Sequence, residues 1–187
     1  PGFDEGLFYV QDRAARMAVE IAAPKAGMRV LDACSCPGGK SFAAAIAMEN
    51  CGSILSCDIH EKKLRLVRDG AQRLGIDIIE TAAMDARAFR AELAESFDIV
   101  IADVPCSGFG VIAKKPEIRS KTPESIAELP KIQGEILDNV SKYVCPGGVL
   151  LYSTCTVTAE ENENTVKAFL ERNGEYTAEP FEVCGVS

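Results

Sequence analysis

The stretch LDACSCPGGKS, from Leu31 to Ser41, joins an apolar run to a helical pattern through two adjacent glycines. The run Met28–Ala33 predicts a short buried strand, and residues 38–49 predict a helix. A strand, a glycine turn and a helix in this order form the first unit of an α/β fold. The tail Gly-Gly-Lys-Ser has the form of a phosphate-binding loop, but Cys34 stands where that motif needs its first glycine. The phosphate-loop interpretation therefore fails, and the ligand of the loop stays open at this point.

Apolar runs and amphipathic stretches alternate along the rest of the chain. Four further apolar runs predict short buried strands at Ser53–Asp58, Ile76–Thr81, Phe97–Asp103 and Gly148–Thr154. Helical patterns are found at residues 12–23, 61–74, 86–95, 124–144 and 160–172. Nearly continuous apolar strands are typical of a parallel sheet that helices cover on both faces. We therefore predict an α/β fold with a doubly wound, mostly parallel sheet.

Composition limits the class of protein. The 187 residues are enough for one domain with a buried core, and 47% of them are apolar. No apolar run approaches the roughly 20 residues that a membrane span needs. Eight cysteines without a CxxC pair fit reduced thiols in a cytoplasmic protein. His60, the only histidine, is expected on a surface loop, and its isolation argues against a metal site and against serine–histidine chemistry.

Charge is distributed unevenly along the chain. The formal net charge of −8 argues against a strongly binding nucleic-acid domain. The segment Lys114–Lys121 is nevertheless basic, and much of the acidic excess lies in Glu160–Glu182. A basic loop of this size is compatible with contact to a polyanion.

Both ends of the chain favour a domain excised from a longer protein. The stretch Tyr176–Val183 predicts a sixth strand close to the last residue, and the chain begins at Pro1 without a methionine. We therefore expect residues 1–187 to be a single catalytic domain of a longer protein.

Polar and reactive groups follow the ends of the predicted strands. Besides the glycine loop, these groups are Asp58, Asp85, Asp103–Gly108 and Ser153–Thr156. Because ligands bind beyond the carboxyl ends of parallel strands, we expect these groups at one edge of the sheet. Gly38 and Gly39 let a ligand approach free N–H groups at a helix start, which suits a carboxylate as well as a phosphate. Asp58 could accept from two ribose hydroxyls, as in a nicotinamide dinucleotide site.

Two cysteines lie at the ends of neighbouring predicted strands. Cys106 follows Asp103 by three residues on a strand-end turn, and Cys155 ends the next strand. A pair of thiols beside a carboxylate indicates nucleophilic chemistry. Four other cysteines are interpreted as small buried hydrophobes: Cys34, Cys51, Cys57 and Cys145.

Four motifs then point to one family. They are VQDRAA (residues 10–15), DACSCPGGK (32–40), DVPCSGFGVIAKKPEI (103–118) and YSTCTVTAEENE (152–163). In this order they resemble the motifs of the RNA cytosine-5 methyltransferases, and most closely the bacterial 16S ribosomal RNA enzymes of the Sun type. The usual loop of that family is C-A-A-P-G-G-K, so Ser35 and Cys36 replace two alanines here.

The resemblance implies a Rossmann-like, class I S-adenosylmethionine-dependent methyltransferase fold. It implies that S-adenosylmethionine binds across the loop formed by Cys34, Ser35, Cys36, Pro37, Gly38, Gly39 and Lys40. It also implies Asp58 on the ribose, Asp85 near the adenine and Asp103 near the reacting centre. Relatives carry an N-terminal RNA-binding domain and a further strand, so we expect the last strand of the sheet to be missing here.

The resemblance also implies the substrate and the roles of the cysteines. Cys155 would attack carbon 6 of a cytidine in small-subunit ribosomal RNA, and Cys106 would assist release of the product. Asp103 would supply a hydrogen bond to ring nitrogen 3. The proline–cysteine motif of DNA cytosine methyltransferases would nominate Cys106 instead, but the STCT context favours Cys155.

Other interpretations explain less of the sequence. A nicotinamide-dependent oxidoreductase leaves both cysteine motifs without a role, and a DNA methyltransferase leaves Cys155 without one. A non-catalytic ribosomal RNA-binding assembly factor would not need Asp103, Cys106 and Cys155 together. Another RNA such as tRNA stays an alternative substrate. We expect a cytoplasmic monomer that binds no metal and no membrane.

Overall fold

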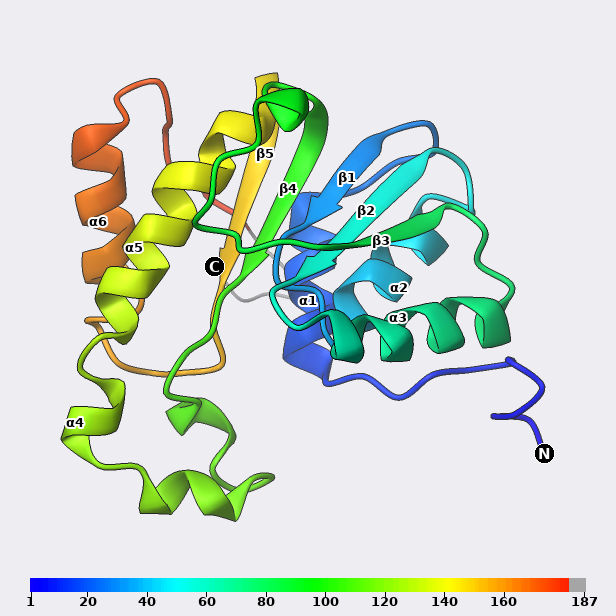
Figure 1. Cartoon of the computed structure of the whole chain (residues 1–187), viewed down its shortest axis with the longest axis horizontal. Coiled ribbons are helices and arrows are strands. Elements are labelled where there is room, and N and C mark those ends of the chain that lie inside the picture. The colour runs from blue at the N-terminus through cyan, green and yellow to red at the C-terminus, as the bar shows by residue number, and fades with distance from the viewer. Residues whose placement is uncertain (182–187) are drawn as a thin grey trace.

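The computed structural model describes residues 1–181, in which five parallel strands form one sheet (Figure 1). The strands are β1 (Arg29–Asp32), β2 (Ser53–Asp58), β3 (Ile79–Ala83), β4 (Phe97–Asp103) and β5 (Val144–Ser153). They are ordered β3-β2-β1-β4-β5, and every neighbouring pair is parallel. The order reverses between β1 and β4, which is where open α/β sheets bind ligands. The predicted fold class is confirmed.

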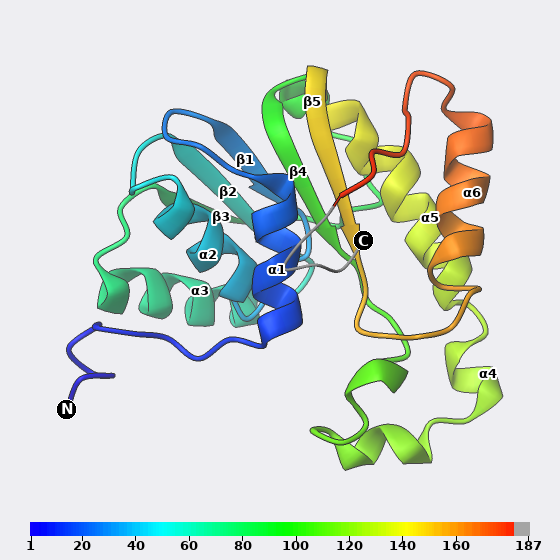
Figure 2. The same cartoon turned by 180° about the vertical axis from the view of Figure 1, so that it is seen from behind.

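Helices cover both faces of the sheet (Figures 1 and 2). They are α1 (Arg13–Ala22), α2 (Gly39–Ala47), α3 (Glu61–Leu74), α4 (Pro123–Ile126), α5 (Leu129–Val140) and α6 (Glu163–Arg172). Short 3₁₀ turns are η1 (Ala91–Leu93), η2 (Phe109–Val111), η3 (Pro116–Ser120) and η4 (Ser141–Tyr143). No helix within residues 1–181 combines the length and the apolar character that crossing a membrane requires.

Alternate residues of the central strands fill two cores. Val30 of β1 packs in one core with α1, α2 and α3, whereas its neighbour Leu31 packs in the other with α5 and α6. Ile101 and Ala102 of β4 divide between the two cores in the same way. Successive side chains of a strand point to opposite faces, so a strand that is apolar throughout must be covered on both. The buried sheet thus supplies a rigid base for the loops at its edge.

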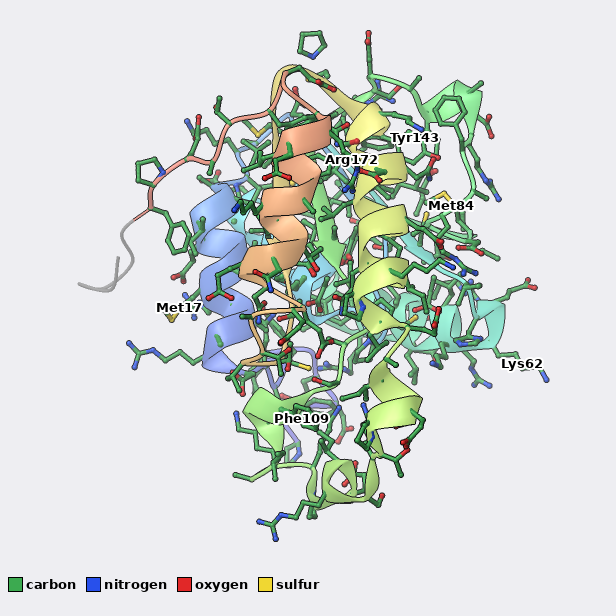
Figure 3. The ribbon with its side chains drawn as sticks, turned by 90° about the vertical axis from the view of Figure 1, so that its left-hand side faces the viewer. Met17, Lys62, Met84, Phe109, Tyr143 and Arg172 are labelled. Carbon is green, nitrogen blue, oxygen red and sulfur yellow. The ribbon has the colours of Figure 1, made fainter. Side chains whose placement is uncertain are left out.

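The predicted helix at residues 86–95 is wrong. Only η1 forms there, because side chains of α5 and η4 bind the backbone groups that a helix would use. Asn139 donates to the carbonyl of Ala86 at 2.8 Å, and the Tyr143 hydroxyl accepts from the Arg90 N–H at 2.8 Å. Phe89 stacks on Tyr143 with ring centroids 5.9 Å apart, and Figure 3 labels Tyr143 near the end of α5.

Other predicted boundaries also shift. The helix predicted at residues 124–144 divides into α4, α5 and η4, and Pro130 lies in the first turn of α5, where its missing N–H is not needed. β3 starts at Ile79 instead of Ile76, because Gly75 ends α3 and the chain needs three residues to reach the sheet. β5 starts at Val144, four residues before the predicted Gly148, with an irregularity in its pairing to β4.

The predicted sixth strand is not formed by its described residues. Tyr176 packs on Phe169 of α6, with ring centroids 5.3 Å apart, and its hydroxyl donates to the Ser141 carbonyl at 2.7 Å. Residues 177–181 carry no regular secondary structure. The end of the predicted strand, Glu182–Val183, lies outside the described residues. Tyr176 therefore packs against α6 and η4 instead of pairing with the sheet.

Two segments frame the carboxyl edge of the sheet. Residues 104–128, which hold η2, η3 and α4, project beyond this edge (Figure 1). We call them the projecting segment; Phe109 marks it in Figure 3. The N-terminal residues 1–12 run past α3, where Arg73 donates to the carbonyls of Phe3 at 2.6 Å and Phe8 at 3.0 Å. Asp12 then caps α1 by accepting from the Ala14 N–H.

Candidate active site

The predicted polar and reactive groups do lie at one edge of the sheet. The glycine loop leaves β1, Asp58 ends β2, Asp85 follows β3, Asp103 ends β4, and Cys155 follows β5. Asp103 and Ser153 are paired residues of neighbouring strands, so the two cysteine-bearing turns start side by side. The parallel register alone brings together groups that are far apart in the sequence.

The glycine loop leaves the start of α2 open. Gly38 has φ of +112°, and a Cβ there would lie 2.6 Å from the ring of Phe42, so a larger residue would be strained and would clash. Gln11 packs on Gly39, where its amide nitrogen would lie 3.4 Å from an added Cβ. No side chain caps α2, so its first N–H groups are available to a ligand.

Lys40 turns from this loop toward β4. Its Nζ lies 2.5 Å from Oδ2 of Asp103, and its side chain is only 11% exposed. The hydroxyl of Ser153 donates to the other oxygen of Asp103 at 2.7 Å. The family resemblance implies a contact between Lys40 and the cofactor. In the structure, its ammonium lies at the carboxylate of Asp103.

The other two predicted carboxylates, Asp58 and Asp85, differ in the hydrogen bonds that they already accept. Oδ1 of Asp58 accepts from the His60 N–H at 2.8 Å, which fixes the side chain at the end of β2. His60 itself is exposed, on the loop before α3, as predicted. Asp85 is engaged by Arg87, whose Nε and Nη2 donate at 3.0 and 2.8 Å. These hydrogen bonds lower the pKa of Asp85 and keep it ionised.

Cys106 and Cys155 face each other across the two turns. Their Sγ atoms are 3.1 Å apart, and the N–H of Cys155 lies 3.2 Å from Sγ of Cys106. The hydrogen bond from Cys106 lowers the pKa of Cys155 to about 6, although partial burial and the charge of Asp103 oppose this. The same hydrogen bond raises the pKa of Cys106. At neutral pH the pair therefore presents a thiolate at Cys155 and a proton donor at Cys106.

Glycines of the projecting segment make room for this pair. The N–H of Gly110 donates to the carbonyl of Cys155 at 3.0 Å, and a Cβ at Gly110 would lie 2.9 Å from that oxygen. Gly108 has φ of +79°, and its added Cβ would lie 3.8 Å from Sγ of Cys155. The glycines of DVPCSGFG therefore fix the backbone of Cys155.

The family described as 16S rRNA methyltransferase RsmB/F matches residues 19–187 of this chain. The chain belongs to the RsmB/F family. A probable ribosomal RNA small subunit methyltransferase B of Bacillus subtilis is 41% identical over 176 residues, which cover 93% of this chain and 39% of that protein. This chain therefore spans about two fifths of the length of that relative.

Two solved structures are similar to this RsmB/F family member. PH0851 has a TM-score of 0.88 at 36% identity, covering 91% of this chain and 39% of that one. NSun6 from Pyrococcus horikoshii, solved with SFG, has a TM-score of 0.80 at 31% identity, covering 91% and 44%. SFG is an analogue of S-adenosylmethionine, so the expected cofactor class agrees with these relatives.

Sequence analysis of this RsmB/F member missed a buried carboxylate, Asp32. It ends β1, is 1% exposed, and accepts from the Ser41 hydroxyl at 2.7 Å, which in turn contacts Ser56. Among residues 1–181, its Oδ1 finds no hydrogen-bond partner. Burial raises its pKa to about 7. The sequence signal for Asp32 was its place at the end of an otherwise apolar strand, directly before the glycine loop.

The prediction for the remaining cysteines was partly wrong. Cys57 is buried in β2, and Cys34 and Cys145 are half-buried. Cys51 is exposed, because it lies in the turn between α2 and β2 instead of in an element with a buried face. Burial raises the pKa of Cys57 to about 12 and that of Cys36 to about 11, so neither thiol competes with Cys155 as a nucleophile.

The basic segment is less free than its composition indicates. Lys114 forms an ion pair with Asp12, which ties the projecting segment to the start of α1. Lys121 donates to the Ser107 carbonyl at 2.7 Å, beside Cys106. Lys115 and Arg119 are exposed and remain the cations available to a polyanion. Within residues 1–181 no cluster of His, Cys, Asp and Glu side chains has the form of a metal site.

Proposed function

We propose that this chain methylates carbon 5 of a cytidine in small-subunit ribosomal RNA through a covalent cysteine–cytosine intermediate. The observation that carries the proposal is the pair Cys106 and Cys155, 3.1 Å apart beside Asp103 at the carboxyl edge. Base methylation without covalent attack needs no thiolate. A pair of thiols with opposite pKa shifts supports chemistry in which one cysteine attacks and the other handles a proton.

The residues around the glycine loop fit S-adenosylmethionine. The uncapped start of α2 suits the carboxylate of its methionine part, since backbone N–H groups and the helix dipole both favour an anion there. Asp58 keeps one carboxylate oxygen for the ribose hydroxyls, and Asp85 follows the next strand, on the adenine side. When bound, the cofactor would supply the methyl group.

Carbon 5 of cytosine is a weak nucleophile, and the two cysteines would change this. The thiolate of Cys155 adds to carbon 6, a carbon–sulfur bond forms, and the ring becomes an enamine that is nucleophilic at carbon 5. After carbon 5 has taken up the methyl group, its proton passes to a solvent water. The electrons of that carbon–hydrogen bond then re-form the double bond between carbons 5 and 6 as the thiolate is expelled. Cys106, which is in hydrogen-bond contact with the leaving sulfur, would assist that expulsion.

Asp103 would stabilise the charge that attack places on the ring. A hydrogen bond to ring nitrogen 3 requires a proton donor, and the Lys40 ammonium, which donates a hydrogen bond to Asp103 at 2.5 Å, brings one to this carboxylate. Ser153 fixes the other oxygen, so the carboxylate cannot turn away from the cysteines. We propose that Lys40 and Asp103 act together as this donor, prepared before the substrate arrives.

The thiol pair fits a protein of the reducing cytoplasm, and the chain fits the catalytic part of a larger enzyme. An oxidised pair could not attack, so the chemistry requires a compartment that keeps thiols reduced. We propose that residues 1–187 are the catalytic part of a monomeric enzyme, and that other parts supply most of the affinity for ribosomal RNA. A scaffold protein would not need the cysteine pair.

Mapping of 5-methylcytosine in RNA tests this function. Cells with and without the gene should differ at one or a few cytidines of 16S ribosomal RNA, and restoring the gene should restore the mark. If the change is confined to tRNA, the substrate is tRNA and not ribosomal RNA. Unchanged RNA in both pools, with intact 16S processing, would contradict the methyltransferase proposal.

A further inference from the structure

A buried carboxylate, Glu161, lies between the two cysteine-bearing turns. It is 3% exposed and comes from the end of the motif YSTCTVTAEENE, six residues after Cys155. Its Oε2 accepts from the Ser107 N–H at 2.8 Å and from the Gln133 amide at 2.9 Å. Its Oε1 accepts from the Thr158 hydroxyl at 3.1 Å. All of these groups donate hydrogen bonds, and none of them is a cation.

On one side, Glu161 holds the turn that carries Cys106. Ser107 directly follows Cys106 and is fully buried. Its N–H donates to Glu161, its hydroxyl contacts that of Thr156 at 2.7 Å, and its carbonyl accepts from Lys121 at 2.7 Å. Three hydrogen-bond partners from two segments, Thr156 and Glu161 in the motif YSTCTVTAEENE and Lys121 in the projecting segment, therefore fix Ser107 next to Cys106.

On the other side, the motif holds the turn that carries Cys155. Glu161 binds Thr158, and its neighbour Asn162 accepts from the Thr154 hydroxyl at 2.7 Å. Asn162 also donates to the carbonyl of Thr158 at 2.9 Å. Two adjacent residues thus bind the chain on both sides of Cys155, while one of them also binds the Cys106 turn.

We propose that Glu161 is a positioning residue of the cysteine pair, whose carboxylate holds the Cys106 turn against the Cys155 turn. A buried carboxylate is stable only when its oxygens accept hydrogen bonds, so its placement requires that both turns come close. Burial acts to raise the pKa of Glu161, but the hydrogen bonds from Ser107, Gln133 and Thr158 together lower it. The carboxylate of Glu161 therefore accepts hydrogen bonds from both turns.

Replacement by methionine separates this role from the role of volume. The methionine side chain has almost the same size but accepts hydrogen bonds only weakly, so the Ser107 N–H and the Gln133 amide, which both bind Oε2 of Glu161, lose their acceptor. Two buried donors without an acceptor are unfavourable, so one of the turns must move. The contact between the two sulfurs is then lost, and with it the hydrogen bond that favours the Cys155 thiolate.

The consequence for methylation rests on the proposed function, but the positioning itself does not. The test therefore measures the thiols directly, without RNA or cofactor. Wild-type protein and Glu161→Met are treated with iodoacetamide over a range of pH, and alkylation of each cysteine is followed by peptide mass spectrometry. In the wild type Cys155 should react with a midpoint near pH 6.

In Glu161→Met this midpoint should move upward toward about 8.5, the value of an isolated thiol. At pH 6.5 the alkylation of Cys155 should fall about fivefold, because the lost thiolate is only partly offset by the higher nucleophilicity of the more basic sulfur. The matched control is Glu160→Met, a change at the exposed neighbouring glutamate, and its profile should equal that of the wild type.

A thermal melt of each variant shows whether it is folded. A folded Glu161→Met with an unchanged Cys155 profile overturns the proposal. If this variant does not fold, Gln133→Met decides, because it removes one partner of Glu161 and keeps the carboxylate. That change should move the Cys155 midpoint in the same direction by a smaller amount, and an unchanged midpoint there overturns the proposal too.

Discussion

The ammonium of Lys40 lies 2.5 Å from the carboxylate of Asp103, so an ion pair joins the glycine loop to the end of β4. The lysine side chain is 11% exposed and the aspartate 36% exposed, so solvent screens the pair only in part. We expect Lys40→Met to lower the free energy of unfolding by about 1 kcal/mol, a value discounted for the exposure of Asp103.

A double-mutant cycle with Asp103→Asn measures this coupling by urea unfolding. The control is Lys62→Met, a change at an exposed lysine of α3 that points away from the body of the protein in Figure 3. Equal losses from Lys40→Met in the presence and absence of the Asp103 charge would show that the pair does not stabilise the fold.

The sheet could be predicted from the sequence because its strands are built around short runs of apolar residues. The boundaries that failed depend on contacts between distant parts of the chain. Nothing near Ala86 indicates that Asn139, 53 positions later, will bind its carbonyl and prevent a helix. Likewise, the break before α5 follows from Pro130, which a helical pattern of apolar residues does not take into account.

For the site, strand order predicted which groups meet at the edge, but not which atoms pair. Lys40 and Asp103 are 63 positions apart, and Glu161 and Ser107 are 54 apart, so their pairing exists only in the folded sheet. The position of Asp58 at the end of a strand was readable in advance. The engagement of Asp85 by Arg87 was not, because it depends on the turn that follows β3.

Asp58 should contribute directly to the affinity for S-adenosylmethionine. Asp58→Ala should weaken binding by about 1–3 kcal/mol, because the ribose hydroxyls then lose their acceptor. Isothermal titration calorimetry measures this, with Asp69→Ala on the exposed face of α3 as the control. Heat from a nicotinamide dinucleotide, with none from S-adenosylmethionine, would overturn the cofactor assignment.

The buried carboxyl of Asp32 should give stability a pH dependence of defined sign. Burial raises its pKa from 3.8 to about 7, so the folded state binds a proton that the unfolded state releases above about pH 4. Its contribution to stability is therefore complete below about pH 4 and is lost as the pH rises to about 7, by up to about 1.4 kcal/mol per pH unit.

Urea unfolding between these pH values checks the Asp32 prediction. Asp32→Asn does not titrate, so the difference in free energy of unfolding between wild type and variant should change across this window. The wild type should lose stability relative to the variant as the pH rises. A difference that is constant with pH would mean that Asp32 does not hold the proton.

The exposed cations of the projecting segment should govern contact with RNA. Because the net charge is −8, residues 1–187 alone should bind ribosomal RNA more weakly than a full-length relative and with strong salt dependence. Lys115→Ala should reduce the salt slope by about 0.7–0.9, whereas Lys114→Ala should do less because Asp12 already pairs with Lys114. Fluorescence anisotropy at several salt concentrations measures both. Equal affinity of the fragment and the full-length relative would show that these residues carry the RNA site themselves.

The two cysteines should give opposite results when each is replaced. In Cys155→Ala no thiolate can reach ring carbon 6, so methylation should vanish and no covalent complex should form. In Cys106→Ala attack and methyl transfer stay possible, but the sulfur of Cys155 loses the contact at 3.1 Å that assists its expulsion. This variant should therefore accumulate a protein–RNA adduct.

Denaturing gel electrophoresis of full-length protein with ribosomal RNA and S-adenosylmethionine reveals the adduct. The control is Cys51→Ala, which removes an exposed thiol in the turn between α2 and β2 and should behave as the wild type. An adduct from Cys155→Ala and none from Cys106→Ala would assign the attack to Cys106. That outcome would also conflict with the lowered pKa of Cys155, because the thiolate of the pair would then belong to the other sulfur.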